Sequence, residues 1–324
     1  MTRRSVLCSL FSVLCLFSGC GPTYPKERIK ESIVDICKKE YKIDVKASTA
    51  GKTIGIYLPL PNLIDFTFAI TKDASDKIND VLLSVTRVAL STDARYDFYC
   101  VIAHDVRIPE IQVVIIKSVD DVKRFFLQDI SRGEYSKRMI IDMRVSPQAE
   151  KERTIRDILG KMKLDEKTQE DVMNDFFRTE PSELGEIGYW NDKFYLKGIT
   201  LAEFIAEQIA SRIKMEFRED KDIYKNFSLR SAKGRYVFQG ERRLFSFEAL
   251  AVMKEKERPR EDIILRKILD ITGGVIHSYR FTDFDFLDIL ERGENKFLRV
   301  SRDDLELYRV KKLRFENLIK AVPA

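Results

Sequence analysis

The stretch "DASDKINDVLLSVTRVALSTDARYDFYCVIAHDVRIPEIQVVIIK", residues 73–117, determines the fold that the sequence predicts. Its first part places apolar residues at helical spacing, and Asp73 or Ser75 could cap this helix. Residues 96–103 and 111–117 are rich in β-branched and aromatic side chains, which favour strands. The stretch therefore predicts a helix followed by two strands that are joined by a turn.

The same order of patterns precedes this stretch. Apolar residues after Lys26 recur at helical spacing, and strand patterns at residues 43–45 and 54–57 flank a turn that contains a glycine. A further helix is predicted for residues 120–130. Residues 26–130 are therefore expected to form the order α-β-β-α-β-β-α.

The C-terminal part has a similar order of patterns. The elements predicted there are, in order, a helix at 201–217, strands at 227–230, 236–239 and 244–253 that are joined at residues 233–234 and 239–240, a helix at 263–271, and a long hairpin of residues 275–290 and 297–310. This part therefore resembles a degenerate second copy of the first, on the order of its elements alone.

A charged region with helical patterns at residues 148–162 and 165–177 lies between these parts. The sequence therefore predicts an α+β protein with two lobes of αββ-type units, whose antiparallel sheets carry helices on one face. An N-terminal α+β domain would cover residues 26–146, a helical connector residues 147–199, and a C-terminal α+β domain residues 200–324.

Four aromatic side chains gather near the end of this connector, namely Tyr189, Trp190, Phe194 and Tyr195. Such clusters form binding hot spots or the walls of ligand sites. They also fill gaps between lobes. Packing between the lobes is the favoured interpretation because the cluster lies in the predicted connector, and a binding cluster is the alternative.

The N-terminus has the pattern of a secretory signal. Arg3 and Arg4 precede an apolar, uncharged segment at residues 6–17, which is shorter than the roughly 20 residues of a membrane-spanning helix. The segment ends in Leu16-Phe17-Ser18-Gly19-Cys20, where small residues lead directly into a cysteine.

This ending resembles the lipobox of bacterial lipoproteins, although Phe17 stands where that family usually has Leu. The resemblance implies that the signal peptide, residues 1–19, is removed, that Cys20 is acylated, and that residues 20–25 form a tether. It also implies a lipid-anchored location in the bacterial cell envelope, and in a Gram-negative cell Gly21 in place of Asp slightly favours the outer membrane. Two or three acyl chains give stable anchoring. The alternatives are an ordinary secreted protein and a short uncleaved anchor.

This interpretation determines which cysteines could form a disulfide. Cys8 and Cys15 leave with the signal and Cys20 is acylated, so Cys37 and Cys100 remain of the five. An oxidising envelope permits a disulfide between them. The alternative is two separate buried thiols.

No motif predicts a catalytic residue, a cofactor or a metal. Gly51-Lys52-Thr53 resembles the end of a phosphate-binding loop, but a strand pattern rather than a helix follows it. Asp283, Asp285 and Asp288 alternate with apolar residues, as on a half-buried strand, and lack the further ligands of a calcium loop. The two histidines, His104 and His277, are far apart and belong to no zinc-binding pattern.

Charge and composition narrow the function. The 57 basic and 52 acidic residues nearly balance, which argues against a nucleic-acid-binding protein. We therefore expect a non-catalytic binding or assembly module that is attached to the membrane by its N-terminal lipid and binds another envelope protein. The alternatives are a lipid-anchored enzyme whose active site is assembled only in three dimensions, and a solute-binding lipoprotein.

Overall fold

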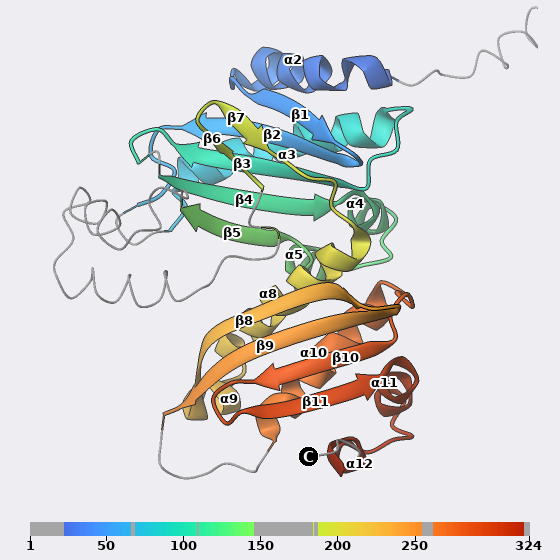
Figure 1. Ribbon diagram of the computed structural model, residues 1–324. Helices are drawn as coiled ribbons and strands as arrows, with labels where there is room; N and C mark the ends of the chain where they lie inside the picture. Colours follow the sequence, from blue (N-terminus) through green and yellow to red (C-terminus); the bar gives the residue numbers. More distant parts are fainter. Residues whose placement is uncertain are drawn as a thin grey trace, which may run out of the picture.

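A computed structural model describes residues 23–65, 69–108, 110–145, 184, 187–254 and 262–320. Figure 1 shows two lobes, each with a β-sheet and helices, stacked one above the other. The first lobe contains a five-stranded sheet and the second a four-stranded sheet. The predicted α+β class with two sheet-containing lobes is therefore confirmed.

The first lobe has the predicted order of elements, followed by a further helix and a further strand. It consists of a 3₁₀ turn (Lys26–Arg28), α2 (Ile29–Tyr41), β1 (Lys46–Ala50), β2 (Thr53–Leu60), α3 (Lys72–Ser91), β3 (Phe98–Asp105), β4 (Ile111–Ser118), α4 (Val119–Phe126), α5 (Arg132–Lys137) and β5 (Ile140–Val145). The strands are ordered β1-β2-β3-β4-β5, and β2 pairs with β3 in parallel because α3 crosses over between them. The sheet is thus mixed, whereas the sequence predicted an antiparallel one.

Helix α3 begins earlier than predicted. Thr71, rather than Asp73 or Ser75, is its cap, and the Thr71 hydroxyl accepts a hydrogen bond from the Ala74 amide. Asp73 instead lies in the first turn, where a negative charge interacts favourably with the helix dipole, and pairs with Lys77.

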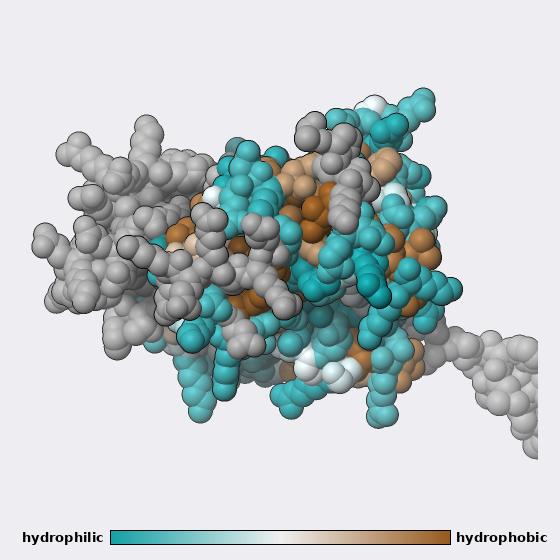
Figure 2. Space-filling view, turned by 90° about the horizontal axis from the view of Figure 1, so that it is seen from below, coloured by the Kyte–Doolittle hydropathy of each residue, from teal (hydrophilic) through white to brown (hydrophobic). Residues whose placement is uncertain are grey.

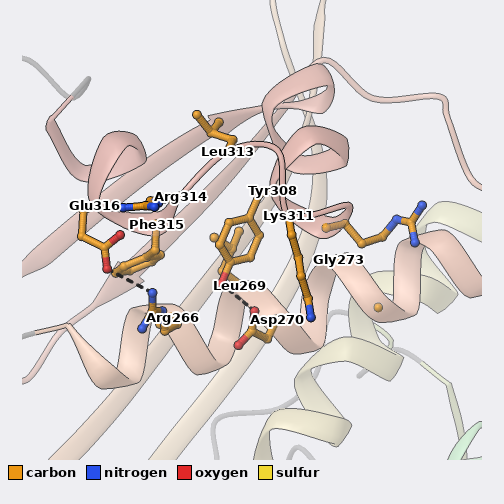
Figure 3. Close-up of a pocket in the computed structure, with 12 residues that line it drawn as sticks. Arg266, Leu269, Asp270, Gly273, Tyr308, Lys311, Leu313, Arg314, Phe315 and Glu316 are labelled. Carbon is orange, nitrogen blue, oxygen red and sulfur yellow. Dashed lines mark hydrogen bonds and ion pairs between the residues drawn. The ribbon is translucent and has the colours of Figure 1, made fainter.

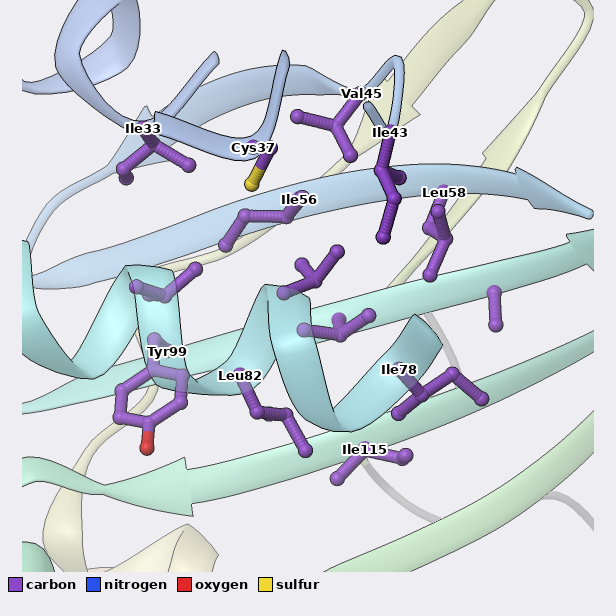
Figure 4. Close-up of a cluster of buried hydrophobic side chains, with 14 of the residues drawn as sticks. Ile33, Cys37, Ile43, Val45, Ile56, Leu58, Ile78, Leu82, Tyr99 and Ile115 are labelled. Atoms are coloured by element: carbon purple, nitrogen blue, oxygen red, sulfur yellow. The ribbon is translucent and has the colours of Figure 1, made fainter. Parts of the chain in front are cut away.

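The main core of this lobe lies between the sheet and helices α2 and α3. Figure 4 shows side chains from α2 (Ile33, Cys37) and α3 (Ile78, Leu82) directed at the strands. Burial of these apolar side chains is the main stabilising contribution, roughly 1.5–3 kcal/mol for each large one. The helical spacing of the apolar residues in the sequence predicted this face correctly.

The second lobe repeats the architecture. It consists of α8 (Leu201–Glu219), α9 (Lys221–Asn226), β8 (Phe227–Gln239), β9 (Arg242–Met253), α10 (Ile263–Ser278), β10 (Phe286–Glu291), β11 (Lys296–Ser301), α11 (Arg302–Arg309) and α12 (Phe315–Lys320). Its strands are ordered β11-β10-β9-β8, and β9 pairs with β10 in parallel. The central parallel pair with an antiparallel neighbour on each side is common to both sheets.

Three boundaries in the second lobe were predicted wrongly. The turn expected at residues 233–234 is absent, because β8 continues through Gly234 and pairs with β9 along its length. A side chain at Gly234 would collide with the Ala206 carbonyl oxygen of α8, so this glycine permits a close helix–sheet contact. The strand expected to begin at residue 275 is also wrong, because α10 continues to Ser278. The strand expected to continue to residue 310 ends at Ser301, and α11 follows it directly.

The helical segments that follow β4 and β11 match in length and in the positions of their caps. Residues 118–137, here called the first corner, and residues 301–320, the second corner, each contain an eight-residue helix and a six-residue helix. Ser118 and Ser301 end the preceding strands and cap the first helices. Gln128 and Lys311, ten residues later, both have a φ of 61°. The corners are therefore two copies of one structural unit.

The lobes meet through a buried ionic network. Asp121 of α4 accepts hydrogen bonds from Arg138 (2.6 Å) and from the Tyr279 hydroxyl (2.7 Å), which follows α10. Arg138 also pairs with Glu134, which binds Arg212 of α8. The Asp121 and Arg138 side chains are almost completely buried, so loss of either one would leave an unpaired buried charge.

The corners also suggest a stability test at Lys117. Lys117 precedes Ser118 as Val300 precedes Ser301, and burial lowers the pKa of Lys117 to about 8. Below pH 8 the Lys117 ammonium is therefore charged at a cost to the stability of the folded protein. This cost disappears as the pH rises from 8 towards roughly 10.4, the pKa of lysine in the unfolded chain. We expect Lys117→Val to raise the free energy of unfolding at pH 7 by about 1–2 kcal/mol, as measured by urea denaturation.

The advantage of the valine variant should shrink between pH 8 and 10. Lys193→Val, at an exposed position of a strand, is the control and should show no such dependence on pH. If the difference in free energy of unfolding between wild type and Lys117→Val stayed constant from pH 8 to 10, the lowered pKa of Lys117 would be contradicted.

Candidate functional site

The predicted aromatic cluster lies on a β-hairpin. Strands β6 (Gly188–Trp190) and β7 (Lys193–Tyr195) pair antiparallel, so this part of the predicted helical connector is not helical. The helices predicted at 148–162 and 165–177 lie outside the described residues. The hairpin and residues up to Ile199 cover the face of the first sheet that is opposite α2 and α3.

The four aromatic residues have different environments. Tyr189 is buried and stacks on Tyr57 of β2, with ring centroids 3.8 Å apart, and Phe194 meets Tyr189 edge-on at 5.0 Å. Trp190 is half-buried, and Tyr195 remains 47% exposed. The cluster therefore packs mainly on the first sheet rather than filling a gap between the lobes.

Polar groups surround the stacked tyrosines. The Lys46 ammonium donates a hydrogen bond to the Tyr189 hydroxyl (2.6 Å) and lies 5.0 Å from the centroid of its ring. The Tyr57 hydroxyl and His104 Nδ1 are 2.6 Å apart. The hydrogen bond to Tyr189 raises the pKa of Lys46, and burial raises the pKa of Tyr57, so Lys46 is charged and Tyr57 is a neutral phenol at neutral pH.

Gln112 and Arg144 hold the hairpin backbone. The Gln112 amide accepts a hydrogen bond from the Tyr189 N–H (3.0 Å) and donates one to the Tyr189 carbonyl. Arg144 donates to the Ile187 carbonyl. Gln112 thus bonds the Tyr189 N–H and C=O as a neighbouring strand would. Both backbone groups of this buried residue are therefore satisfied.

His104, Gln112 and Arg144 form a row across three neighbouring strands. His104 is the partner of Gln112 in the β3–β4 register, and Gln112 is the partner of Arg144 in the β4–β5 register. Gln112 and Arg144 were not among the residues that the sequence patterns predicted to be functional. The available signal was a polar residue at position 112 inside an otherwise apolar strand.

This row works as a structural clamp, which we call the hairpin clamp (His104, Gln112, Arg144 with Tyr57 and Tyr189). Its polar atoms hold the backbone or other side chains in place. The one hydroxyl beside a possible base within the clamp is that of Tyr57, next to His104, and burial raises its pKa, which makes it a poor nucleophile. Among the described residues, no three metal-ligating side chains converge.

The two cysteines do not form the disulfide that the sequence allowed. Both are free and buried. Cys37 of α2 lies in the core beneath α2 and α3, whereas Cys100 of β3 faces the hairpin on the other side of the sheet. Alternate residues of a strand point to opposite faces, so the sheet itself separates the thiols. The alternative expectation, two separate buried thiols, is what the structure has.

Other residues considered from the sequence have structural partners. Asp283 pairs with Arg243, Asp285 accepts from the Arg243 amide (2.7 Å), and Asp288 binds Arg299 through both carboxylate oxygens. Gly51 has a φ of 54° and turns the β1–β2 hairpin, so the phosphate-loop resemblance has no structural counterpart.

Two cavities lie in the second lobe, on either side of α11. One, of about 400 Å³, lies between α10, α11 and α12, and Figure 3 shows its lining. The other, of about 370 Å³, includes His277 and Arg280. Viewed from this end of the molecule, apolar surface shows between hydrophilic side chains (Figure 2). These cavities, rather than the aromatic cluster, are the candidate binding site.

Cys20 lies outside the described residues. Each helix within the described part of the chain is too short or too polar to cross a membrane.

Comparison with known proteins gives no match to this chain, whether with protein-family models, curated proteins or solved structures. Its function is therefore argued from its own residues.

The hairpin clamp can be tested through Trp190, the single tryptophan of the chain. Gln112→Ala leaves the buried N–H and C=O of Tyr189 unpaired, and we expect a loss of about 2–3 kcal/mol in the free energy of unfolding. Trp190 emission should shift to longer wavelength and become easier to quench with acrylamide. Gln239→Ala, at the exposed end of β8, is the control. Unchanged emission in Gln112→Ala would contradict the clamp.

The thiols can be tested by alkylation. Burial raises the pKa of Cys37, and it raises that of Cys100 to about 12, so neither thiolate forms readily near neutral pH. We expect iodoacetamide to modify neither residue in the folded protein and both in urea. The mass of each peptide should not depend on prior reduction. A peptide pair that is linked before reduction and separates after it would show a disulfide instead.

Proposed function

We propose that this protein is a lipid-anchored, non-catalytic binding module of the bacterial cell envelope. The first lobe follows the tether, and the second lobe carries the binding site and presents it to another envelope component. The single observation that carries this proposal is the position of the two cavities, which lie in the second lobe around α11.

The arrangement of the chain supports this division. Helix α2, which follows the predicted tether, and helix α12 lie at opposite ends of the stacked lobes (Figure 1). A lipid at Cys20 would therefore attach the molecule to the membrane through the first lobe, at the end opposite α12. The buried network around Asp121 joins the lobes, so the site would be held at a fixed distance from the tether.

The chemistry of the polar clusters also favours binding over catalysis. In the hairpin clamp, His104 faces a phenol whose pKa is raised by burial, which makes that hydroxyl a poor nucleophile. The carboxylates of Asp283, Asp285 and Asp288 are held by arginines or by backbone. Structural roles account for these residues without a reaction.

The test combines anchoring with crosslinking in cells. Wild-type protein should fractionate with membranes and show acyl mass on its N-terminal cysteine, and Cys20→Ser should be released. Cys15→Ser, inside the signal, is the matched control and should behave as wild type. A photo-crosslinking residue at Lys311, beside the larger cavity, should give a discrete adduct, whereas one at Lys30 on α2 should give none.

Two results would contradict the proposal. If the Cys20→Ser variant fractionated with membranes and had the mass of wild type apart from the substitution, the predicted lipid anchor would be contradicted. Equal crosslinking from the probes at Lys311 and Lys30 would contradict a binding surface in the second lobe.

A further inference from the structure

The larger cavity combines an apolar floor with a charged rim. Leu269, Gly273 and Gly274 of α10 contribute to its lining, together with the rings of Tyr308 and Phe315. The Tyr308 hydroxyl donates a hydrogen bond to Asp270 (2.7 Å), as Figure 3 shows. A ligand in this space would therefore contact both apolar carbon and charged groups.

Cations exceed carboxylates on the rim. The lining contains four cations and two carboxylates, namely Arg266, Arg309, Lys311 and Arg314 against Asp270 and Glu316. Both carboxylates are already engaged, Glu316 by Arg266 (3.1 Å) and Asp270 by Tyr308. The Lys311 and Arg314 side chains are exposed and form no ion pair or hydrogen bond with the described residues. They leave positive charge available at the mouth of the cavity.

The first corner shows that the fold itself does not require these cations. Counting from the capping serines, four cations of the second corner replace uncharged or acidic residues of the first, in the pairs Phe126 and Arg309, Gln128 and Lys311, Asp129 and Lys312, and Ser131 and Arg314. The backbone is the same at these positions, including the φ of 61° at Gln128 and Lys311. These four positions thus carry positive charge only in the second corner.

The first corner is packed differently by its aromatic side chains. There, Phe125 stacks on Tyr135 with ring centroids 4.6 Å apart. The corresponding residues in the second corner are Tyr308 and Leu318, so the stacked ring has no counterpart. The Tyr308 ring instead borders the cavity.

The two glycines of α10 have different explanations. A side chain at Gly273 would approach Leu305 of α11 to 3.3 Å, so close helix packing accounts for this glycine. A side chain at Gly274 would meet no atom within 4 Å. Glycine inside a helix destabilises it by roughly 0.5–1 kcal/mol relative to alanine, and packing gives no reason for it here. An empty position at 274 keeps the cavity open.

We propose that the cavity between α10, α11 and α12 binds a small organic oxyanion, a phosphate or carboxylate group attached to an apolar body. Lys311 and Arg314 bind the charged group, and Tyr308 and Phe315 contact the apolar body. This proposal names the ligand class for the proposed binding role and rests on it. The same chemistry is found in soluble organic phosphates and in the headgroups of anionic lipids.

Purified full-length protein carrying Cys20→Ser tests the proposal without an acyl anchor. Phenyl phosphate, followed by calorimetry, represents the soluble source, and vesicles of phosphatidylglycerol, compared with phosphatidylcholine, represent the lipid source. Binding of phenyl phosphate alone assigns a soluble ligand, and selective binding to phosphatidylglycerol alone assigns a lipid headgroup. Binding of both supports a site for the shared chemistry.

Variants connect the binding to the cavity. Lys311→Ala with Arg314→Ala should weaken binding at least about tenfold, because charge-assisted hydrogen bonds are lost. Lys30→Ala with Lys72→Ala removes the same charge from exposed positions of the first lobe and should leave binding unchanged. Gly274→Ala should raise the unfolding temperature and weaken phenyl phosphate binding, because its methyl group enters the cavity.

Failure to bind either probe overturns the proposal. So does equal weakening by the two charge variants, or unchanged binding in both the Lys311/Arg314 and Gly274 variants. The readout uses protein that cannot be acylated. A failed anchoring test would therefore contradict the proposed envelope role and leave this binding result intact.

Discussion

The first sheet is apolar on both faces, and much of the molecule follows from this constraint. Strands β2, β3 and β4 are buried along nearly their whole length, so helices on one face do not suffice to cover them. The second cover comes from residues 184 and 187–199, with Leu196 packed over Gly55, and from Phe204 of α8 beside Phe98. The segment that leads to the second lobe therefore completes the core of the first, and the lobes cannot be arranged independently.

The position of α8 then brings charged groups into the boundary between the lobes. Phe204 packs against Tyr279 as well as Phe98, and Tyr279 reaches Asp121 through its hydroxyl. Burial of an ion pair such as Asp121–Arg138 contributes little net stability, but removal of one partner typically costs about 3–5 kcal/mol. The network therefore favours one arrangement of the lobes over others more than it strengthens the fold.

The sequence predicted elements whose pattern is local and missed those that depend on distant partners. The order of helices and strands over residues 26–126 followed from helical spacing and strand composition, as did α8. The turn predicted at Gly234 was wrong because that glycine accommodates Ala206, which is distant in sequence. The clamp residue Gln112 could be noticed as a polar residue in an apolar strand, but its partner, the backbone of Tyr189, lies 77 residues away. The sequence did not predict the cavity because its walls come from three helices that are separate in sequence. Its cations stand out only when residues 301–320 are aligned with residues 118–137, and this alignment follows from the structure.

The two corners show how one backbone can serve two purposes. In the first, stacked rings fill the space and the α4 surface is buried against the second lobe through Asp121. In the second, Asp304 has the same capping contact as Asp121, and among the described residues its side chain forms a hydrogen bond with Ser301 alone. The second sheet also differs on its outer face, where Asp288 and Arg299 occupy the positions of Cys100 and Ile116, so this face is compatible with water. The first copy thus uses its surfaces to hold the chain together, and the second copy leaves its surfaces, with their surplus of cations around α11, free for a ligand.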